Sequence, residues 1–155
     1  MNDREAGEKA AIVFIGIPAS GKSSFYERNF QHGFVRVNLD TLRTRKKEQA
    51  LLEACLEEGR SFVVDNTNPT RADRRRYIPP AKAAGYRVDG YFFQSVIKDC
   101  AERNERREGK ARVPAQAIAA ISGKLEMPGL DEGFDRLFFV KIEGDGFVVE
   151  QWRDS

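Results

Sequence analysis

The sequence has little of several residue types on which common enzyme classes depend. His32 is its one histidine, which excludes a triad with a histidine base and most histidine metal sites, and we expect it at the surface ahead of Gly33. The two cysteines, Cys55 and Cys100, stand far apart with no C-x-x-C spacing. This pattern favours structural thiols in a reducing compartment over a disulfide framework or a zinc site.

Long hydrophobic runs are also missing. The longest apolar runs have the length of a strand, and the first five residues are polar, so we expect neither a signal peptide nor a membrane-spanning helix. At 155 residues, with 41% hydrophobic and 32% charged residues, the composition is that of one soluble domain covering residues 1–155. A cytoplasmic enzyme without a membrane partner is the default expectation, with residues 1–9 flexible.

The small net charge of +2 hides an uneven distribution. From Glu126 onward there are three basic and eight acidic residues, which leaves 23 basic and 16 acidic residues in the rest of the chain. The basic residues gather in 43–47, 71–76 and 98–112. Solvated helix faces explain such clusters more often than phosphate partners do, but beside a triphosphate site they favour a polyanionic second substrate.

The most informative segment is present rather than absent: residues 16–23 read Gly-Ile-Pro-Ala-Ser-Gly-Lys-Ser and follow the apolar run 11–15. This is the phosphate-binding loop pattern G-x-x-x-x-G-K-[ST] between a strand and a helix, and the two flanking elements argue against a chance lysine in a glycine-rich turn. Backbone N–H groups of such a loop cradle phosphates, the lysine reaches the terminal phosphates, and the hydroxyl binds the accompanying magnesium. We expect ATP to contact Gly16, Ile17, Pro18, Ala19, Ser20, Gly21, Lys22, Ser23 and Ser24.

Strand-like and helix-like segments alternate along the chain. The pattern predicts strands at 11–16, 34–37, 61–64, 86–93, 137–142 and 147–149, the last two joined by the turn Gly144-Asp145-Gly146. It predicts helices at 21–30, 40–58, 96–108 and 114–126, and another from Pro69 to Gly85 that is disturbed near Pro79-Pro80. The fold class is therefore α/β: a single P-loop NTPase or kinase domain with a mainly parallel sheet, helices on both faces and a C-terminal β-hairpin.

Asp40 lies in the segment Asn38-Leu39-Asp40-Thr41-Leu42-Arg43 after the second predicted strand. This position places it at the carboxyl edge of the sheet beside the phosphate-binding loop, where it could accept a proton from an attacking hydroxyl. Aspartate also caps helices well, and that alternative is equally open. Arg43, one turn later, could hold a phosphate of an acceptor or could be an ordinary surface residue.

Asp65 follows the third predicted strand and begins the run Asp65-Asn66-Thr67-Asn68-Pro69. A carboxylate at the tip of an apolar strand is the Walker B arrangement, which supports a magnesium ion. The Asn-Thr-Asn run could equally serve local hydrogen bonding in a turn.

Arg103 and Arg107 lie four residues apart in a basic helix and therefore share one face. Arginines near the phosphates can neutralise the charge that develops during phosphoryl transfer. The alternative is a solvated face paired with Glu102, Glu105 and Glu108.

Taken together, these segments resemble the 5′-hydroxyl polynucleotide kinase family, the kinase half of polynucleotide kinase–phosphatases. The matching pieces are GIPASGKSSFY at 16–26, NLDTLR at 38–43, DNTNPTRADRRRYI at 65–78, RNERR at 103–107 and PGLDEGF at 128–134. They occur in the family's order over about 120 residues.

The resemblance implies a role for each matching residue. Asp40 looks like the general base that activates a 5′-hydroxyl, and Arg43, with Thr41 beside it, like the grip on the adjoining phosphate. Lys22 and Ser23 keep their phosphate and magnesium roles, with Asp65 as metal support. Arg107 is the best match to the lid arginine, and Arg103 is the second. The implied cofactors are ATP and Mg²⁺, and the implied acceptor is a nucleic-acid 5′ end or another phosphorylated hydroxyl acceptor.

The chain departs from the family in lacking an Asp-x-Asp-Gly-Thr phosphatase signature. Related small phosphate-loop proteins phosphorylate metabolites, so a small-molecule or nucleoside kinase is the first alternative. The second is an NTP-hydrolysing switch or regulatory module, although no Asn-Lys-x-Asp or Leu-Ser-Gly-Gly-Gln element is present.

Overall fold

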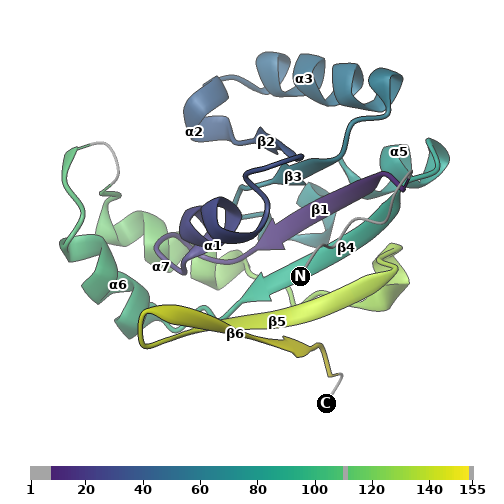
Figure 1. Ribbon diagram of the computed structural model, residues 1–155. Helices are drawn as coiled ribbons and strands as arrows, with labels where there is room; N and C mark the ends of the chain where they lie inside the picture. The colour runs from purple at the N-terminus through teal and green to yellow at the C-terminus, as the bar shows by residue number, and fades with distance from the viewer. Residues whose placement is uncertain (1–7, 110–111, 154–155) are drawn as a thin grey trace.

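A six-stranded sheet forms the centre of the computed structural model, which describes residues 8–109 and 112–153 (Figure 1). The strand order is β2-β3-β1-β4-β5-β6, with parallel pairing throughout except for the antiparallel β5–β6 hairpin. The strands are β1 Ala10–Ile15, β2 Val35–Val37, β3 Phe62–Val64, β4 Arg87–Phe93, β5 Arg136–Glu143 and β6 Gly146–Gln151. The predicted fold class, including the C-terminal hairpin, is confirmed.

Helices follow the strands in the predicted order. They are α1 Lys22–Asn29, α2 Leu39–Leu42, α3 Arg45–Glu58, α4 Arg71–Arg74, α5 Ile78–Ala83, α6 Ile97–Glu105 and α7 Ala115–Lys124, followed by the 3-10 turn η2 Leu130–Glu132. The continuous helix predicted over 40–58 is wrong. Arg43 takes a left-handed φ of 76°, which ends α2, and the Thr44 side chain then caps α3 by accepting the Lys47 N–H.

The region from Pro69 to Gly85 is disturbed as predicted, but at a different place. The chain leaves helical form between α4 and α5, whereas Pro79 and Pro80 lie in the first turn of α5. A proline costs little there because the first N–H groups of a helix have no partner within the helix.

The core has two sides because β1 is buried along its whole length. Ile12 and Phe14 face α1, where Phe14, Phe25, Phe30, Tyr91 and Phe93 form edge-to-face and tilted ring contacts. Ala11 and Val13 face α3 and α5 through Leu52, Cys55, Ile78 and Ala81. Burying such a side chain contributes roughly 1.5–3 kcal/mol each, so both faces hold the sheet rigid beneath the loops.

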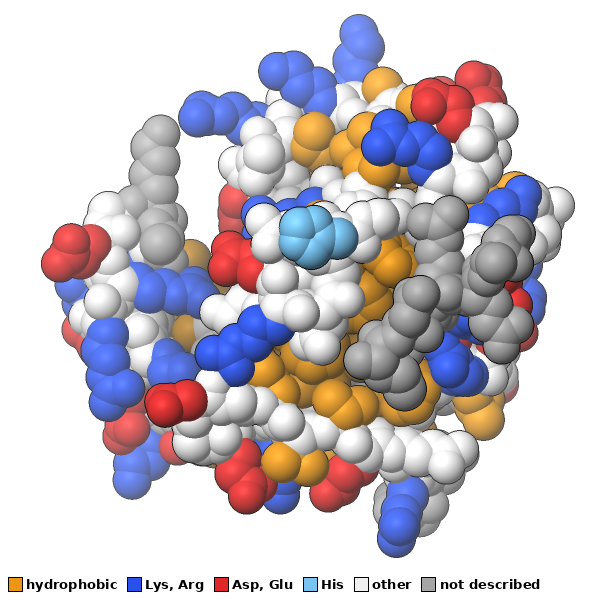
Figure 2. Space-filling view, viewed as in Figure 1, with side chains coloured by type: hydrophobic (Ala, Val, Ile, Leu, Met, Phe, Trp, Pro, Cys, Tyr) orange, Lys and Arg blue, Asp and Glu red, His pale blue; other side chains and the backbone are white. Residues whose placement is uncertain are grey.

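The amino-terminal segment was predicted to be flexible over residues 1–9, and residues 1–7 lie outside the described part of the chain. Glu8 pairs with Arg87, and the Lys9 ammonium lies 4.9 Å from the centre of the Tyr86 ring. Within 8–109 and 112–153, no helix combines the length and apolarity needed to cross a bilayer. His32 is exposed, as predicted (Figure 2).

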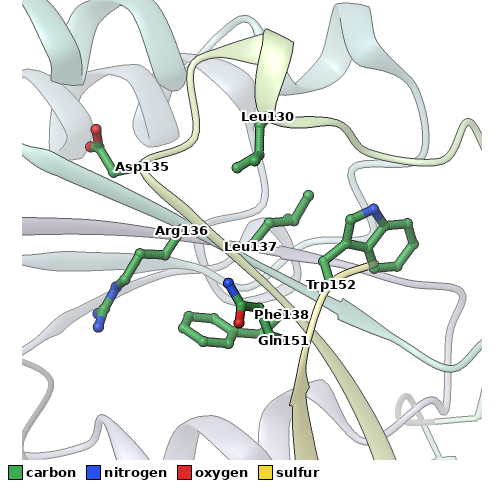
Figure 3. A pocket seen from close by; sticks show the side chains of 7 residues that line it. All are labelled: Leu130, Asp135, Arg136, Leu137, Phe138, Gln151 and Trp152. Atoms are coloured by element: carbon green, nitrogen blue, oxygen red, sulfur yellow. The ribbon is translucent and has the colours of Figure 1, made fainter. Parts of the chain in front are cut away.

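A small apolar pocket lies at the end of the sheet where β5 begins and β6 finishes. It has a volume of about 130 Å³, and in Figure 3 the side chains of Leu130, Leu137 and Trp152 surround it. Its charged neighbours are paired, because Asp135 accepts from Lys82 and Arg136 contacts Asp89. The loops that follow the parallel strands lie at the opposite end of the sheet.

Candidate active site

The phosphate-binding loop, residues 16–23, is fixed by bonds to two neighbouring loops. Gly16 N–H donates to the Thr67 carbonyl at 3.0 Å, and Ile17 N–H donates to Ser95 Oγ at 3.1 Å. A Cβ at Gly16 would lie 2.8 Å from Ser20 Oγ and 3.0 Å from Phe93 Cβ, so only glycine fits this curl of the backbone.

Lys22 is buried, and its ammonium points into the loop. Nζ donates to the carbonyls of Gly16 and Ile17 at 2.9 and 2.8 Å, and to Ser20 Oγ at 3.3 Å. Desolvation lowers the pKa of Lys22 to about 8, while the negative charge of Asp65 opposes that shift. The ammonium is therefore held at the loop by carbonyl dipoles that a bound phosphate would replace.

Asp65 and Ser23 come together as the sequence predicts. Ser23 Oγ donates to Asp65 Oδ2 at 3.2 Å, and Asp65 is only 2% exposed. Oxygen donors of this kind fit Mg²⁺, which in P-loop kinases completes its shell with phosphate oxygens and water. No cluster of three or more His, Cys, Asp or Glu side chains is found over the described ranges, and a shared site of this type does not need one.

The run that begins at Asp65 ties four parts of the site together. Asn66 Oδ1 accepts the Leu39 N–H at 2.9 Å, at the start of α2. The Thr67 carbonyl holds Gly16, and Asn68 Nδ2 donates to the Phe14 carbonyl at 2.8 Å. The hydrogen bonding offered as an alternative is present, but it reaches distant segments rather than closing a local turn.

Asp40 is exposed and lines the main cavity of the site. The cap of α2 is Asn38, whose Oδ1 accepts from Thr41 N–H at 3.0 Å and from the Thr41 hydroxyl at 3.1 Å. Asn38 is held in turn through Nδ2, which donates to the Asp65 carbonyl at 2.6 Å. The helix-cap alternative for Asp40 is therefore wrong, and its carboxylate is presented to the cavity.

Arg43 and Thr41 are exposed and are not among the residues that line this cavity. Arg43 carries one of three positive φ angles found at non-glycine residues in the described chain. Such a conformation is costly for a residue with a Cβ and is found at functional sites more often than elsewhere.

One cavity of about 500 Å³ collects residues from loops far apart in the sequence. The polar side of this cavity comes from the phosphate-binding loop, α2, the loop after β3 and the segment after α6. Its apolar side comes from α7 and from the residue Val113 before it. The lining comprises Pro18, Ala19, Lys22, Ser23, Asn38, Leu39, Asp40, Asp65, Asn66, Thr67, Arg107, Val113, Ala117 and Ile121. It therefore joins Lys22, Ser23, Asp40, Asp65 and Arg107, predicted from separate motifs, in a single space.

A second cavity of about 290 Å³ lies on the other side of the loop, against the β5–β6 hairpin. Its lining comprises Ala19, Gly21, Ser24, Arg28, Arg103, Arg107, Ile142, Gly144, Asp145, Gly146 and Phe147. A Cβ at Gly21, which has a φ of 102°, would lie 3.0 Å from the Phe147 ring and 3.1 Å from Ile142. The hairpin thus packs directly on the phosphate-binding loop.

The two predicted lid arginines differ in their surroundings. Arg103 Nε donates to the Ala19 carbonyl at 2.6 Å and its NH2 group contacts Cys100 Sγ at 3.2 Å, rather than the glutamates of its own helix. Arg107 lines both cavities, so it lies between them. The geometry favours Arg107 over Arg103 for contact with a group that passes between them.

Sequence reasoning missed Arg36, which reaches the site from the middle of β2. Its Nε donates to Asp65 Oδ2 at 2.9 Å and its NH2 group donates to Ser23 Oγ at 2.8 Å. One signal could have found it: a lone charge inside the apolar run Phe34-Val35-Arg36-Val37.

A buried network beneath α2 was also missed. Tyr77 OH donates to Glu48 Oε2 at 3.0 Å, Asn66 Nδ2 donates to the same oxygen at 2.8 Å, and Arg45 donates to Glu48 Oε1 at 2.7 Å. Desolvation and the neighbouring Glu48 charge raise the pKa of Tyr77 to about 12, so its hydroxyl stays a donor. Nothing in the local pattern of α3 identifies Glu48 as buried.

Three of the family-like segments also contain residues with a structural role. Arg74, which is fully buried, pairs with Glu132 through Nε at 2.8 Å, and this joins the DRRRYI and PGLDEGF segments. Arg74 therefore contributes nothing to the basic surface. Asn104 in RNERR bonds both backbone groups of Val113, at 2.7 and 2.9 Å, and closes the segment between α6 and α7.

Curated proteins are similar to this chain over most of its length. The chain is 31% identical over 136 residues to a bifunctional polynucleotide phosphatase/kinase of Schizosaccharomyces pombe, which covers 84% of this chain and 33% of the relative. It is 41% identical over 158 residues to a putative bifunctional polynucleotide phosphatase/kinase of Acanthamoeba polyphaga mimivirus, covering 96% and 37%. The chain thus spans about a third of the length of these relatives, and the resemblance read from its motifs is confirmed.

Solved structures share the fold. Kti12 of Chaetomium thermophilum, solved in complex with ADP-AlF3, aligns with a TM-score of 0.66 and 18% identity over 88% of this chain and 91% of that chain. A family model described as an AAA domain matches residues 12–128, which include the phosphate-binding loop, Asp40, Asp65, Arg103 and Arg107. The chain therefore belongs to this AAA domain family and has the fold of a P-loop kinase.

Proposed function

We propose that this chain transfers the γ-phosphoryl group of ATP to the 5′-hydroxyl of a polynucleotide. The observation that carries the proposal is the cavity in which Lys22 and Ser23 of the phosphate-binding loop face Asp40 of α2. A phosphate donor and a hydroxyl acceptor must meet in one space for transfer, because positioning supplies much of the catalysis. The names of the two curated relatives support a polynucleotide as the acceptor.

Each lining residue has a task in this reaction. The loop N–H groups and Lys22 bind the β- and γ-phosphates, while Ser23 and Asp65 would hold Mg²⁺. Bound there, the metal ion neutralises charge on the phosphate oxygens and orients them. Asp40 accepts the hydroxyl proton as the acceptor oxygen bonds to the γ-phosphorus and the bond from that phosphorus to the bridging oxygen of ADP breaks. The products are ADP, a 5′-phosphate and a proton on Asp40.

Arg107 stabilises the charge on the transferring group, since it lines the cavity that contains Lys22, Ser23 and Asp40. Arg103 has a positioning task, because its bond to the Ala19 carbonyl holds the outer side of the phosphate-binding loop. Arg43 supplies a cation for the phosphate next to the reacting hydroxyl, outside the cavity itself.

A long acceptor is supported by the surroundings of the cavity. Arg43, Arg45, Lys46 and Lys47 are exposed around the junction of α2 and α3. Figure 2 shows lysine and arginine side chains gathered both there and over the α6–α7 lobe, with a hollow between the lobe and the body of the molecule. A backbone of phosphates leaving the cavity would meet positive charge on either side.

The test is transfer of labelled γ-phosphate from ATP, with Mg²⁺, to a short DNA and a matching RNA that end in a 5′-hydroxyl. We expect a labelled 5′ end, no label on the same oligonucleotides already bearing a 5′-phosphate, and loss of transfer in Asp40→Asn. Asp131→Asn is the matched control, because Asp131 is an exposed ion-pair partner of Arg71 and lines neither cavity of the site.

The outcomes separate the readings. Transfer to the 5′-hydroxyl that survives Asp40→Asn would remove Asp40 from the mechanism. Nucleotide binding without transfer to either oligonucleotide would overturn the polynucleotide acceptor and favour a small hydroxyl metabolite. ATP hydrolysis that no hydroxyl acceptor stimulates would favour the NTP-hydrolysing switch.

A further inference from the structure

Arg36 occupies an unusual place for a strand residue. It is the middle residue of β2 and pairs with Val63 in the sheet register, so its side chain lies on the face covered by α1. From there the guanidinium passes over the Tyr26 ring, 5.6 Å from its centre, and reaches the phosphate-binding loop. The side chain is about one-third exposed at 33%.

The two acceptors of Arg36 are the oxygens expected to support the metal. Its NH2 group lies 2.8 Å from Ser23 Oγ and also 2.8 Å from Asp65 Oδ2, while Nε donates to the same Oδ2 at 2.9 Å. One positively charged nitrogen is therefore shared between the loop hydroxyl and the buried carboxylate. A cation bound to Ser23 and Asp65 would need the same place.

We propose that Arg36 is an internal counter-cation that occupies the metal position between Ser23 and Asp65, and that it leaves when the metal–nucleotide complex binds. Without nucleotide, Arg36 balances the buried charge of Asp65, which would otherwise be costly. When the metal–nucleotide complex is bound, Ser23 Oγ and Asp65 Oδ2 would bind the metal instead of the guanidinium. Arg36 is thus a positioning residue that couples metal binding to nucleotide binding, and the inference rests on the proposed nucleotide site.

Competition between Arg36 and the metal predicts the direction in which each nucleotide affinity changes. Replacing Arg36 with glutamine removes the cation that pairs with Asp65 and leaves that carboxylate, still bonded by Ser23 Oγ, facing the phosphates. Metal-free nucleotide should then bind more weakly because like charges repel, whereas metal-bound nucleotide should bind more tightly because no competitor has to leave. The ratio of the two affinities is the quantity that the proposal predicts.

The experiment is calorimetric titration of the whole chain with the non-hydrolysable analogue AMP-PNP, in excess Mg²⁺ and in excess EDTA, without an acceptor. In Arg36→Gln we expect the Mg²⁺-to-EDTA affinity ratio to rise roughly tenfold or more, since charge-assisted hydrogen bonds are lost from the competing state. Arg36→Lys keeps the charge and should stay near the wild-type ratio. Arg71→Gln, which removes an exposed arginine–carboxylate pair elsewhere, is the matched control.

A double-mutant cycle with Asp65→Asn locates the effect. Once the carboxylate is neutral, glutamine at position 36 should no longer change the ratio. Thermal melting of each variant shows whether it is folded, and Arg36→Met, which also removes the positive charge, replaces the glutamine variant if that one does not fold.

Two results would overturn the inference. An unchanged ratio in Arg36→Gln would mean that Arg36 does not compete with the metal, and a lowered ratio would mean that it supports the metal-bound state. Neither result touches the proposed function, which fails instead if the wild-type chain binds no AMP-PNP in excess Mg²⁺.

Discussion

The donor and acceptor sides of the cavity are built in different ways. On the donor side Lys22 is 8% exposed and its ammonium makes three hydrogen bonds within the phosphate-binding loop. On the acceptor side Asp40, Thr41 and Arg43 are all exposed, and the bonds that fix them come from Asn38 and Asn66 beneath. A compact phosphate chain needs a preformed, enclosed binding loop, whereas a large acceptor needs reactive groups that are exposed but fixed in position. The difference predicts which substitutions affect chemistry and which affect nucleotide binding.

Asp40→Asn should have the largest effect. This effect should be on phosphoryl transfer and not on nucleotide binding. Without a carboxylate to take the hydroxyl proton, we expect transfer to fall about 10²–10⁴-fold, the usual contribution of a general base. Affinity for nucleotide should change little because the hydrogen bonds that Lys22 makes within the phosphate-binding loop do not involve Asp40. Single-turnover transfer and calorimetric nucleotide binding measure the two quantities, and a parallel loss of both would erase the division between the sides.

Arg107→Ala should rank next because Arg107 borders both cavities. Loss of one donor aimed at developing charge costs about 10²–10³-fold in kcat. Arg103→Ala should instead weaken nucleotide binding, since it releases the Ala19 carbonyl of the loop. Steady-state kcat and KM for ATP in the two variants decide this, and a larger loss of kcat in Arg103→Ala would reverse the assignment.

Asn66→Ala tests whether the exposed residues of α2 depend on Asn66 for their position. It removes the acceptor of the Leu39 N–H and the donor to Glu48, so we expect kcat to fall about tenfold and the free energy of unfolding to fall by about 1–3 kcal/mol. KM for ATP should change little.

Asn29→Ala is the matched control for this variant, because Asn29 is exposed on α1 and its side chain donates to the Phe25 carbonyl of its own helix. Asn66→Asp keeps the acceptor for Leu39 and should recover part of kcat. A drop in stability with unchanged kcat would show that the network is purely structural.

The smallest expected effect is a pH dependence on the donor side. The pKa of Lys22 is about 8 in the folded chain and 10.5 in its ordinary state, so between these values the unfolded chain binds more protons. Stability of the nucleotide-free protein should therefore rise with pH through this window, by at most about 1.4 kcal/mol per unit. Nucleotide affinity should fall through the same window, by at most roughly tenfold per unit, because the neutral amine loses its attraction for phosphate.

Urea unfolding and AMP-PNP titration at several pH values from below 8 to 10.5 measure these opposite slopes. In Lys22→Met both slopes should disappear. Slopes that persist in that variant would assign the titration to another group.

Sequence patterns predicted the part of the molecule that depends on neighbours along the chain. The apolar run of β1, the loop after it and the polar residues that follow β2 and β3 are all local features. Because parallel strands end at one edge, these features were enough to place Asp40 and Asp65 beside Lys22. The position of the α4–α5 break, at 75–77 rather than near Pro79-Pro80, was not predicted. The division of 40–58 into two helices was not predicted either, since residue type alone does not show a left-handed φ at Arg43.

Long-range pairing accounts for most of what the sequence did not reveal. Arg74 looked like one more member of a basic cluster, yet its partner Glu132 lies 58 residues away. Arg36 and Asp65 are 29 residues apart and Glu48 and Tyr77 are also 29 apart. The packing of elements far apart in the sequence decides whether a charged side chain faces water or a buried partner. The hydrophobic periodicity of a single helix or strand does not show this.

The packing of Phe147 and Ile142 on Gly21 also sets the order in which the molecule can be completed during synthesis. The phosphate-binding loop leaves the ribosome more than a hundred residues before the hairpin that packs on it. Contacts between such distant positions form late because a long segment must first be ordered. The phosphate-binding loop of a nascent chain should therefore lack its contacts with the hairpin until β6 has been made. We expect ATP to stabilise the complete fold only after that point.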